Sequence, residues 1–312
     1  MKNVINSIVL NTGSAIPVIG LGTWQSPAGE VEKAVEYALL ECGYKHVDCA
    51  SIYKNEREIG DAFSRVFSGG KIKRDDIFIT SKLWNTDHKK DDVVVACKKT
   101  LKDLQLDYLD LYLMHWGVAE SVNATRALDE NGCLVTPKIS VRETWEAMEG
   151  LVKNGLVKAI GVANFTGPML IDLLTYANIK PAMVQIELHP YNQQSKFVTF
   201  CLNQGIAVTA YSPLGNPGNK RGKANQPILI QDEKIISIAN DHQKTPAQIL
   251  IRWAFQRHTV VIPKSVTPAN IKNNIDIFNF ELSVADQEVL AGLERKHRFV
   301  DLYDWLEIPY FE

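Results

Sequence analysis

The chain has 312 residues, of which 46% are hydrophobic and 22% are charged, and its formal net charge is -2. The lysines and arginines are spread along it, so the composition disfavours nucleic acid or an anionic membrane as a partner. Five widely spaced cysteines without a Cys-x-x-Cys pair disfavour a disulfide framework and a zinc site. No secretory signal and no membrane-length apolar run is recognised, so we expect a cytoplasmic protein. The scattered histidines and cysteines also lead us to expect no metal.

Short apolar or β-branched runs alternate along the chain with segments of helical spacing. The first helical segment is the clearest, because its apolar residues lie one, three or four positions apart and therefore share one face. These residues are Val31, Ala34, Val35, Ala38, Leu39 and Cys42. The eight runs that we expect to be strands are residues 18–22, 45–48, 77–81, 109–114, 157–162, 183–187, 207–211 and 260–262.

Eight such units without a Ser/Gly/Pro linker favour one closed parallel barrel over two doubly wound domains. We therefore predict an α/β fold, a single (β/α)8 TIM barrel domain that spans residues 1–312. The turn residues 11–13 predict an N-terminal β-hairpin that covers the barrel floor.

Two extra helices are expected beyond the eight of the barrel. One is the segment 232–241, which precedes a helix with Thr245 as N-cap and Pro246 in its first turn. Three long segments, 116–140, 212–231 and the tail from residue 296, are expected to form long loops at the C-terminal face.

Functional residues of such barrels lie at the C-terminal ends of the strands. Polar side chains are found there at Asp48, Ser81, Lys82, His115, Asn164, Gln185, Glu187, His189, Tyr211, Ser212, Lys264 and Ser265. The pair Gly20 and Gly22 is not followed by the third glycine of a Rossmann fingerprint, and no P-loop or His-Glu-x-x-His motif occurs. A Rossmann cofactor fold is therefore disfavoured, and a catalytic metal is not indicated.

Four of these residue types form a consistent set for proton transfer. An ammonium group from Lys82 within hydrogen-bond reach of Tyr53 is expected to lower the tyrosine pKa from its usual value of about 10. Asp48 would keep the lysine charged, and His115 would donate a hydrogen bond to a substrate oxygen. This predicts carbonyl reduction, with hydride added to carbon and a proton to oxygen. A structural ion pair with a packed tyrosine and a core histidine is the alternative.

At these residues the chain resembles the aldo-keto reductase superfamily, in its aldose and xylose reductase branch. The resemblance extends from about residue 10 to residue 311. It is carried by residues 20–24, 43–53, 81–84, 106–116, 185–191, 211–215 and 262–265.

The resemblance implies an NAD(P)H-dependent reductase of aldehydes, aldoses and other carbonyls, with NADPH as cofactor and NADH as the alternative. Hydride would come from nicotinamide C4, and Tyr53 would donate the proton within a catalytic tetrad of Asp48, Tyr53, Lys82 and His115. The cofactor residues that it implies are Thr23, Trp24, Asn164, Gln185, Tyr211, Ser212, Leu214, Lys264, Ser265, Asn270 and Asn274. The substrate residues that it implies are Trp24, Ile52, Trp84, Trp116, Arg221 and Val300.

Within that set, the resemblance implies that Asn164 and Gln185 bind the amide group of the nicotinamide and that Tyr211 stacks on its ring. Residues 212–215 would contact the pyrophosphate, and Lys264 with Ser265 would face the 2'-phosphate.

Departures from the family pattern modify these expectations. Asn270 replaces an arginine of many NADPH-specific members, which weakens strict NADPH preference, although Lys264 keeps NADPH favoured. The tail resembles that of fungal xylose reductases, but Ile52 and Val300 replace polar residues that would bind sugar hydroxyls. Arg221 suggests an anionic substrate, such as a sugar phosphate or an aldehyde acid.

Three other functions compete with carbonyl reduction. Steroid double-bond reductases replace the tetrad histidine by glutamate, so His115 disfavours them. A Schiff-base lyase is disfavoured because a lysine held charged by Asp48 is a poor nucleophile. A cofactor-binding regulatory or structural subunit remains the alternative to an enzyme. By resemblance, the chain would be a monomer or a weak homodimer.

Overall fold

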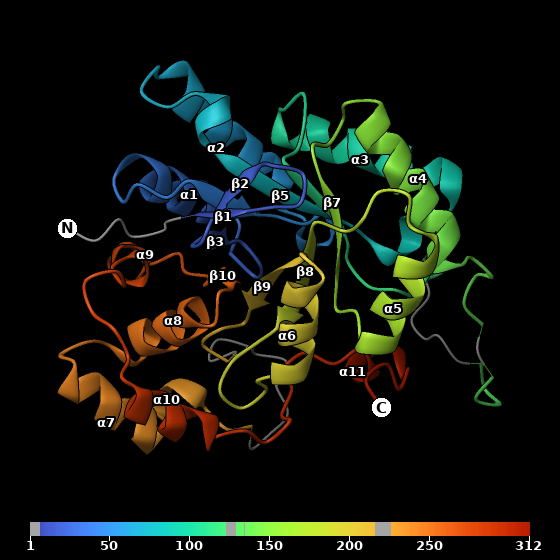
Figure 1. Cartoon of the computed structure of the whole chain (residues 1–312). Helices are drawn as coiled ribbons and strands as arrows, with labels where there is room; N and C mark the ends of the chain where they lie inside the picture. The colour runs from blue at the N-terminus through green and yellow to red at the C-terminus, as the bar shows by residue number, and fades with distance from the viewer. Residues whose placement is uncertain (1–6, 123–128, 134, 216–225) are drawn as a thin grey trace.

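The computed structural model describes residues 7–122, 129–133, 135–215 and 226–312 (Figure 1). Eight strands form one parallel sheet in which each strand pairs with the next along the chain. They are β3 (Leu21–Gly22), β4 (His46–Asp48), β5 (Phe78–Leu83), β6 (Leu111–Met114), β7 (Ile160–Ala163), β8 (Met183–Glu187), β9 (Ala207–Tyr211) and β10 (Val260–Val261).

Parallel bridges close this sheet into a barrel. Ile19 pairs with Val261 and Gly22 with Lys264, which joins the first strand to the last. A Cβ at Gly22 would lie 2.8 Å from the carbonyl oxygen of Ile262, so glycine permits this close approach. The predicted (β/α)8 fold is confirmed.

Eight helices surround the barrel: α1 (Val31–Leu40), α2 (Glu56–Ser68), α3 (Lys90–Leu104), α4 (Val141–Lys153), α5 (Gly167–Tyr176), α6 (Ser195–Asn203), α8 (Pro246–Gln256) and α9 (Pro268–Ile275). Of the six apolar residues that were predicted to share a face, the five that lie in α1 are all buried. The sixth, Cys42, follows the helix and is partly buried. Helix α8 begins as predicted, because the Thr245 side chain accepts a hydrogen bond from the Gln248 amide. None of the described helices is both long and apolar enough to cross a membrane.

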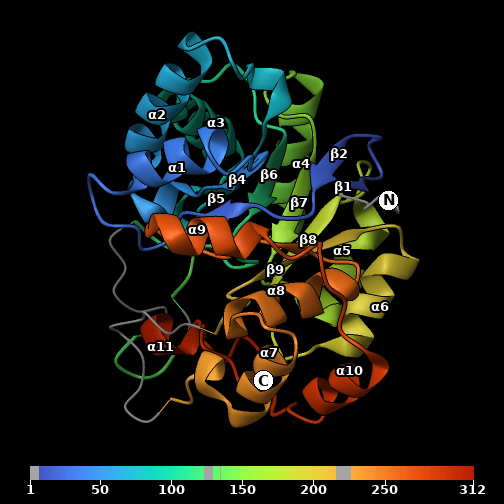
Figure 2. The ribbon, with the colours of Figure 1, turned by 90° about the vertical axis from the view of Figure 1, so that its left-hand side faces the viewer.

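Two extra helices are α7 (Glu233–Asp241), which lies next to α8, and α10 (Val284–Ala291), which lies next to α7 (Figure 2). The tail adds a third, short helix, α11 (Tyr303–Leu306). Helix α7 corresponds closely to the predicted segment 232–241, and Asp232 caps it by accepting a hydrogen bond from the Lys234 amide.

The N-terminal hairpin closes one end of the barrel, as predicted. Its strands β1 (Ser7–Val9) and β2 (Ala15–Pro17) pair antiparallel. Leu10 and Ile16 are buried in an apolar cluster with residues at or near the starts of the barrel strands, among them Phe78 and Leu111. The hairpin and α11 lie on opposite sides of the molecule in Figure 2, which leaves the other end of the barrel to the polar strand ends.

Candidate active site

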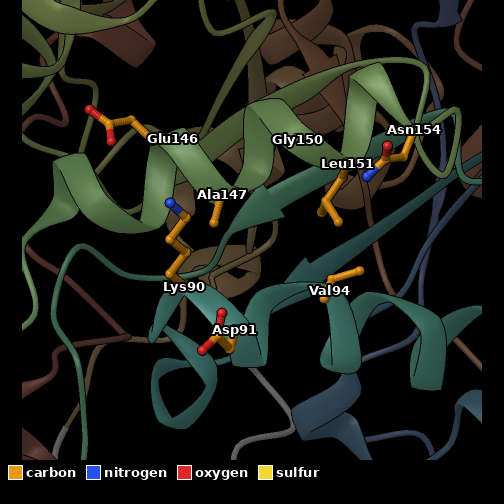
Figure 3. Close-up of a pocket in the computed structure, with 8 residues that line it drawn as sticks. All are labelled: Lys90, Asp91, Val94, Glu146, Ala147, Gly150, Leu151 and Asn154. Carbon is orange, nitrogen blue, oxygen red and sulfur yellow. The ribbon is translucent and has the colours of Figure 1, made fainter.

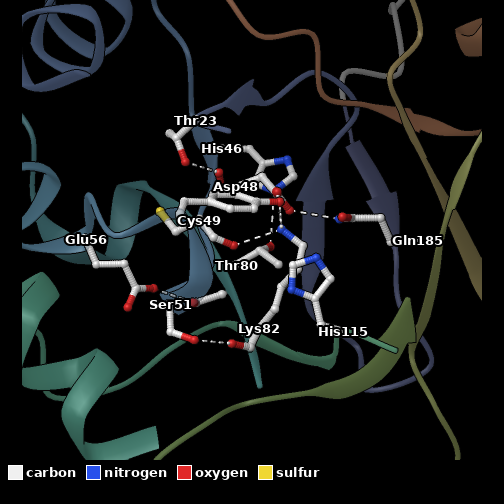
Figure 4. Close-up of polar contacts among 12 residues, drawn as sticks. Thr23, His46, Asp48, Cys49, Ser51, Glu56, Thr80, Lys82, His115 and Gln185 are labelled. Atoms are coloured by element: carbon white, nitrogen blue, oxygen red, sulfur yellow. Dashed lines mark hydrogen bonds and ion pairs between the residues drawn. The ribbon is translucent and has the colours of Figure 1, made fainter. Parts of the chain in front are cut away.

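Lys82 lies at the centre of the polar strand ends. It is fully buried on β5, and its Nζ donates to Asp48 Oδ1 at 2.5 Å and to the carbonyl oxygen of Cys49 at 2.8 Å (Figure 4). The same Nζ donates to the hydroxyl of Tyr53 at 3.2 Å. Asp48 is the last residue of β4, and its Oδ2 accepts from Gln185 Nε2 at 2.8 Å. The structure therefore brings three of the four predicted catalytic residues into direct contact.

Local structure fixes Tyr53 near the lysine. The turn of 3-10 helix Ser51–Tyr53 ends at Lys54, whose φ of 57° is left-handed. Asn55 Nδ2 then donates to the carbonyl oxygen of Thr23 at 2.9 Å, and the Thr23 hydroxyl donates to the carbonyl oxygen of Asp48 at 2.8 Å. These bonds tie the Tyr53 segment to β4 and to the end of β3.

Burial and nearby charges shift the pKa values of Lys82 and Tyr53 in opposite directions. Burial acts to lower the pKa of Lys82, but the nearby Asp48 carboxylate and Tyr53 outweigh it and raise that pKa above its ordinary value. Burial raises the pKa of Tyr53 to about 12, although Lys82 acts to lower it. The prediction that Lys82 gives Tyr53 a lowered pKa is therefore wrong for the net value, because burial outweighs the ammonium. The phenol is fully protonated at neutral pH.

His115 follows β6 and completes the predicted tetrad. Its ring lies edge-on to Tyr53 at a centroid distance of 5.9 Å and edge-on to Trp84 at 5.2 Å. Its Nδ1 is buried without a hydrogen-bond partner among the described residues. Burial, helped by the charge of Lys82, lowers its pKa well below the ordinary value. A neutral imidazole therefore lies beside the tyrosine at physiological pH.

The residues predicted to hold the nicotinamide are connected to this group. Asn164 adopts a left-handed φ of 61°, and its Nδ2 donates to the carbonyl oxygen of His115 at 2.9 Å. Its Oδ1 accepts from the Tyr211 hydroxyl at 2.7 Å. Ser212 and Gly215 also have positive φ, 46° and 70°, so the chain turns sharply after β9.

The residues predicted to face the 2'-phosphate lie after β10. Lys264 Nζ donates to the carbonyl oxygen of Gln25 at 3.2 Å, next to the end of β3, and burial lowers its pKa. The Ser265 hydroxyl accepts from the Thr267 amide at 3.1 Å, just before α9. Asn270 is exposed in the first turn of α9, whereas Asn274 is buried.

The predicted substrate residues differ in their surroundings. Trp24, Ile52, Trp84 and Val300 are partly buried. Trp116 is only 2% exposed, because its ring lies against Trp305, Tyr310 and Phe311 of the tail. Leu214 is partly buried, and Arg221 lies outside the described residues.

One buried carboxylate beside the site was not singled out in the sequence. Glu56 in the first turn of α2 accepts hydrogen bonds from Ser81 at 2.5 Å and Thr100 at 3.0 Å. Burial raises its pKa to about 7. The signal was present, since Glu56 shares a helical face with the buried Ile59 and Phe63.

An open groove of about 410 Å³ lies elsewhere, between α3 and α4 (Figure 3). Its lining residues are Lys90, Asp91, Val94, Glu146, Ala147, Gly150, Leu151 and Asn154. None of them belongs to the predicted site. Within the described ranges, no cluster of three His, Cys, Asp or Glu residues could hold a metal ion.

Comparison with known proteins agrees with this geometry. The model of the Aldo/keto reductase family matches residues 18–294. Aldo-keto reductase family 1 member A1-A of Danio rerio is 46% identical over 94% of this chain and 91% of its own length, and the Homo sapiens member A1 is 43% identical over 94% and 90%. The solved structure of the aldose reductase from Schistosoma japonicum superposes with a TM-score of 0.88, at 42% identity, over 98% of this chain and 97% of that chain. The chain therefore belongs to the aldo/keto reductase family.

Proposed function

We propose that this protein reduces aldehydes to alcohols with NADPH. NAD(P)H-dependent carbonyl reduction is the reaction of its family. The observation that carries the proposal is the position of Lys82 Nζ, which is hydrogen-bonded at once to Asp48 and to the hydroxyl of Tyr53.

Tyr53 is proposed as the proton donor. Its pKa of about 12 keeps the phenol protonated at neutral pH, so the proton is present when the substrate arrives. Donation to the carbonyl oxygen leaves a phenolate, and the Lys82 ammonium 3.2 Å away stabilises that charge. Asp48 holds the ammonium in place and offsets the desolvation of a fully buried lysine.

His115 is proposed to orient the carbonyl group. A neutral imidazole has one N–H, which can donate to the substrate oxygen without competing as a proton source. The ring of Trp84 packs edge-on against it and keeps it beside Tyr53.

The residues at the end of the barrel where the strands end, which we call the mouth, suit an extended nicotinamide cofactor. This cofactor supplies the hydride when bound. Asn164 and Gln185 offer amide groups beside the tetrad, the partly exposed ring of Tyr211 offers a stacking surface, and the turn after β9 offers main-chain groups. After β10, Lys264 and the first turn of α9 would hold the 2'-phosphate of the cofactor. Lys264 favours NADPH, whereas Asn270 supplies no cation, so we expect a preference instead of strict specificity.

The apolar character of the pocket supports aldehydes over sugars. Ile52 and Val300 carry no side-chain hydrogen-bonding group, so aldose hydroxyls would lose water without a replacement partner there. We therefore expect aldoses to be weaker substrates than aromatic aldehydes. We also propose that residues 1–312 form one domain, because the tail returns to pack on Trp116.

The test follows the reduced-nicotinamide absorbance with an aromatic aldehyde, in parallel with NADPH and NADH, for the wild type and Tyr53→Phe. We expect turnover with NADPH and a loss of roughly 10²- to 10⁴-fold in kcat in the variant, because it lacks the donated proton. Cofactor affinity, measured by fluorescence titration, should be retained, which separates a lost proton from a lost fold. Tight cofactor binding without turnover would favour the regulatory-subunit alternative.

A further inference from the structure

The end of β8 carries a buried carboxylate that the proposed chemistry does not use. Glu187 and His189 are both 0% exposed. Glu187 Oε1 accepts from His189 Nε2 at 2.8 Å and from the main-chain amide of Phe299 at 2.6 Å, and its Oε2 accepts from the amide of Val300 at 3.1 Å. One carboxylate therefore binds the backbone of a segment more than a hundred residues further along the chain.

The donor set explains why a carboxylate stands here. A carboxylate only accepts hydrogen bonds, and each of its oxygens has two lone pairs. Three N–H groups satisfy the charge in a place that water does not reach, which offsets its desolvation. The ring of His189 also lies against that of Phe299 at a centroid distance of 5.0 Å, so the tail is held by side-chain packing as well as by its backbone.

The tail beyond this point forms one wall of the proposed site. Leu302 and Leu306 pack on Trp116 in an apolar cluster that also includes Trp84 and Val300. Trp84 in turn contacts His115. The position of Phe299 and Val300 therefore determines where the apolar wall stands relative to the reacting group.

We propose that Glu187, supported by His189, is a latch that positions the tail and thereby determines how well bulky aldehydes bind. Glu187 is a positioning residue, because it acts through Phe299 and Val300 and not on the reacting atoms. The inference rests on the proposed function for its kinetic consequence. The latch itself is a property of the folded chain and is measurable without turnover.

The decisive variant is Glu187→Gln, which keeps the size of the side chain. Its amide nitrogen is a donor, so it cannot accept from a main-chain N–H, and one of the three donors loses its partner. We expect KM for a bulky aromatic aldehyde to rise about tenfold. For a small aliphatic aldehyde, which does not reach the tail, kcat and KM should stay close to the wild type.

The chain offers a matched control in Glu149→Gln. Glu149 on α4 is also a buried carboxylate, and its Oε1 accepts from the main-chain amides of Asn178 and Ile179 at 2.7 and 2.9 Å. These residues lie in the loop between α5 and β8, which leads into the start of β8 at the floor of the barrel. The same chemical change there should lower stability without changing either KM.

Hydrogen exchange of the peptide that contains Phe299 and Val300 is the second readout. We expect faster exchange there in Glu187→Gln and wild-type exchange in Glu149→Gln. Unchanged exchange in Glu187→Gln would overturn the latch, and so would faster exchange with an unchanged KM for the bulky aldehyde. A wild-type chain that reduces no aldehyde would instead overturn the proposed function, whatever the exchange shows.

Discussion

The two ends of the barrel are built from the same strands but from different chemistry. Strand β5 begins with Phe78 in the apolar floor and carries the buried ammonium of Lys82 near its other end. Strand β8 likewise begins with Met183 in the floor and ends with the carboxylate of Glu187 at the mouth. At the floor, burial of apolar surface stabilises the fold, and these side chains need no hydrogen-bond or ion-pair partner.

At the mouth, each buried polar group is tolerated only because another group satisfies it. Lys82 needs Asp48, and Glu187 needs two amides of the tail. Substitutions at the two ends of the barrel should therefore have different effects on the protein. Floor variants should lose stability alone. Variants at the mouth should also lose activity, toward all aldehydes at Lys82 and toward bulky aldehydes alone at Glu187.

The largest effect is expected for Lys82→Met. The phenolate of Tyr53 would lose its ammonium and Asp48 would stay buried without its partner, so kcat should fall roughly 10²- to 10⁴-fold and stability by about 3–5 kcal/mol. Single-turnover kinetics and urea unfolding measure the two losses. The matched control at the floor is Lys158→Met, which breaks a 3.3 Å ion pair with Asp110 in which the lysine is 46% exposed. It should cost about 1 kcal/mol or less and leave kcat unchanged.

A smaller and purely structural effect is expected for Ile16→Ala in the floor. The side chain is 0% exposed between the hairpin and the strand starts, so its truncation should lower the free energy of unfolding by about 2–5 kcal/mol. The kcat of the folded variant should match the wild type at a temperature well below its midpoint. A large loss of kcat in fully folded protein would show that the floor and the mouth are not independent.

The smallest effect concerns Glu56 and depends on pH. Its folded pKa of about 7 lies above the ordinary value of 4.5, so the folded state binds more protons than the unfolded state between these values. Stability should therefore fall as pH rises from about 4.5 to 7, by at most about 3 kcal/mol, and stay level above that range. In Glu56→Gln this fall should be absent. Thermal unfolding of both proteins at pH 5 and pH 7.5 checks this, and an equal pH response in both would refute it.

Local signals in the sequence were sufficient to predict the strands, the cap at Thr245 and which candidate catalytic residues lie together. Strands β8 and β9 have the bounds that were predicted, because their runs are apolar and β-branched and end at polar residues. The helix cap at Thr245 follows from chemistry within four residues. Asp48, Lys82 and His115 could be grouped because parallel strands place their ends together.

The tertiary structure decided what depends on contacts between distant segments. From the sequence we expected a lowered pKa for Tyr53, but burial raises that pKa. Burial depends on how all the segments at this end of the barrel pack together. Nothing near Trp116 in the sequence indicates that the tail covers it. Glu187 and Phe299 are separated by 112 positions, so no periodic pattern connects them. Periodicity and turn chemistry report only neighbours along the chain, whereas burial and long-range hydrogen bonds arise when the barrel closes.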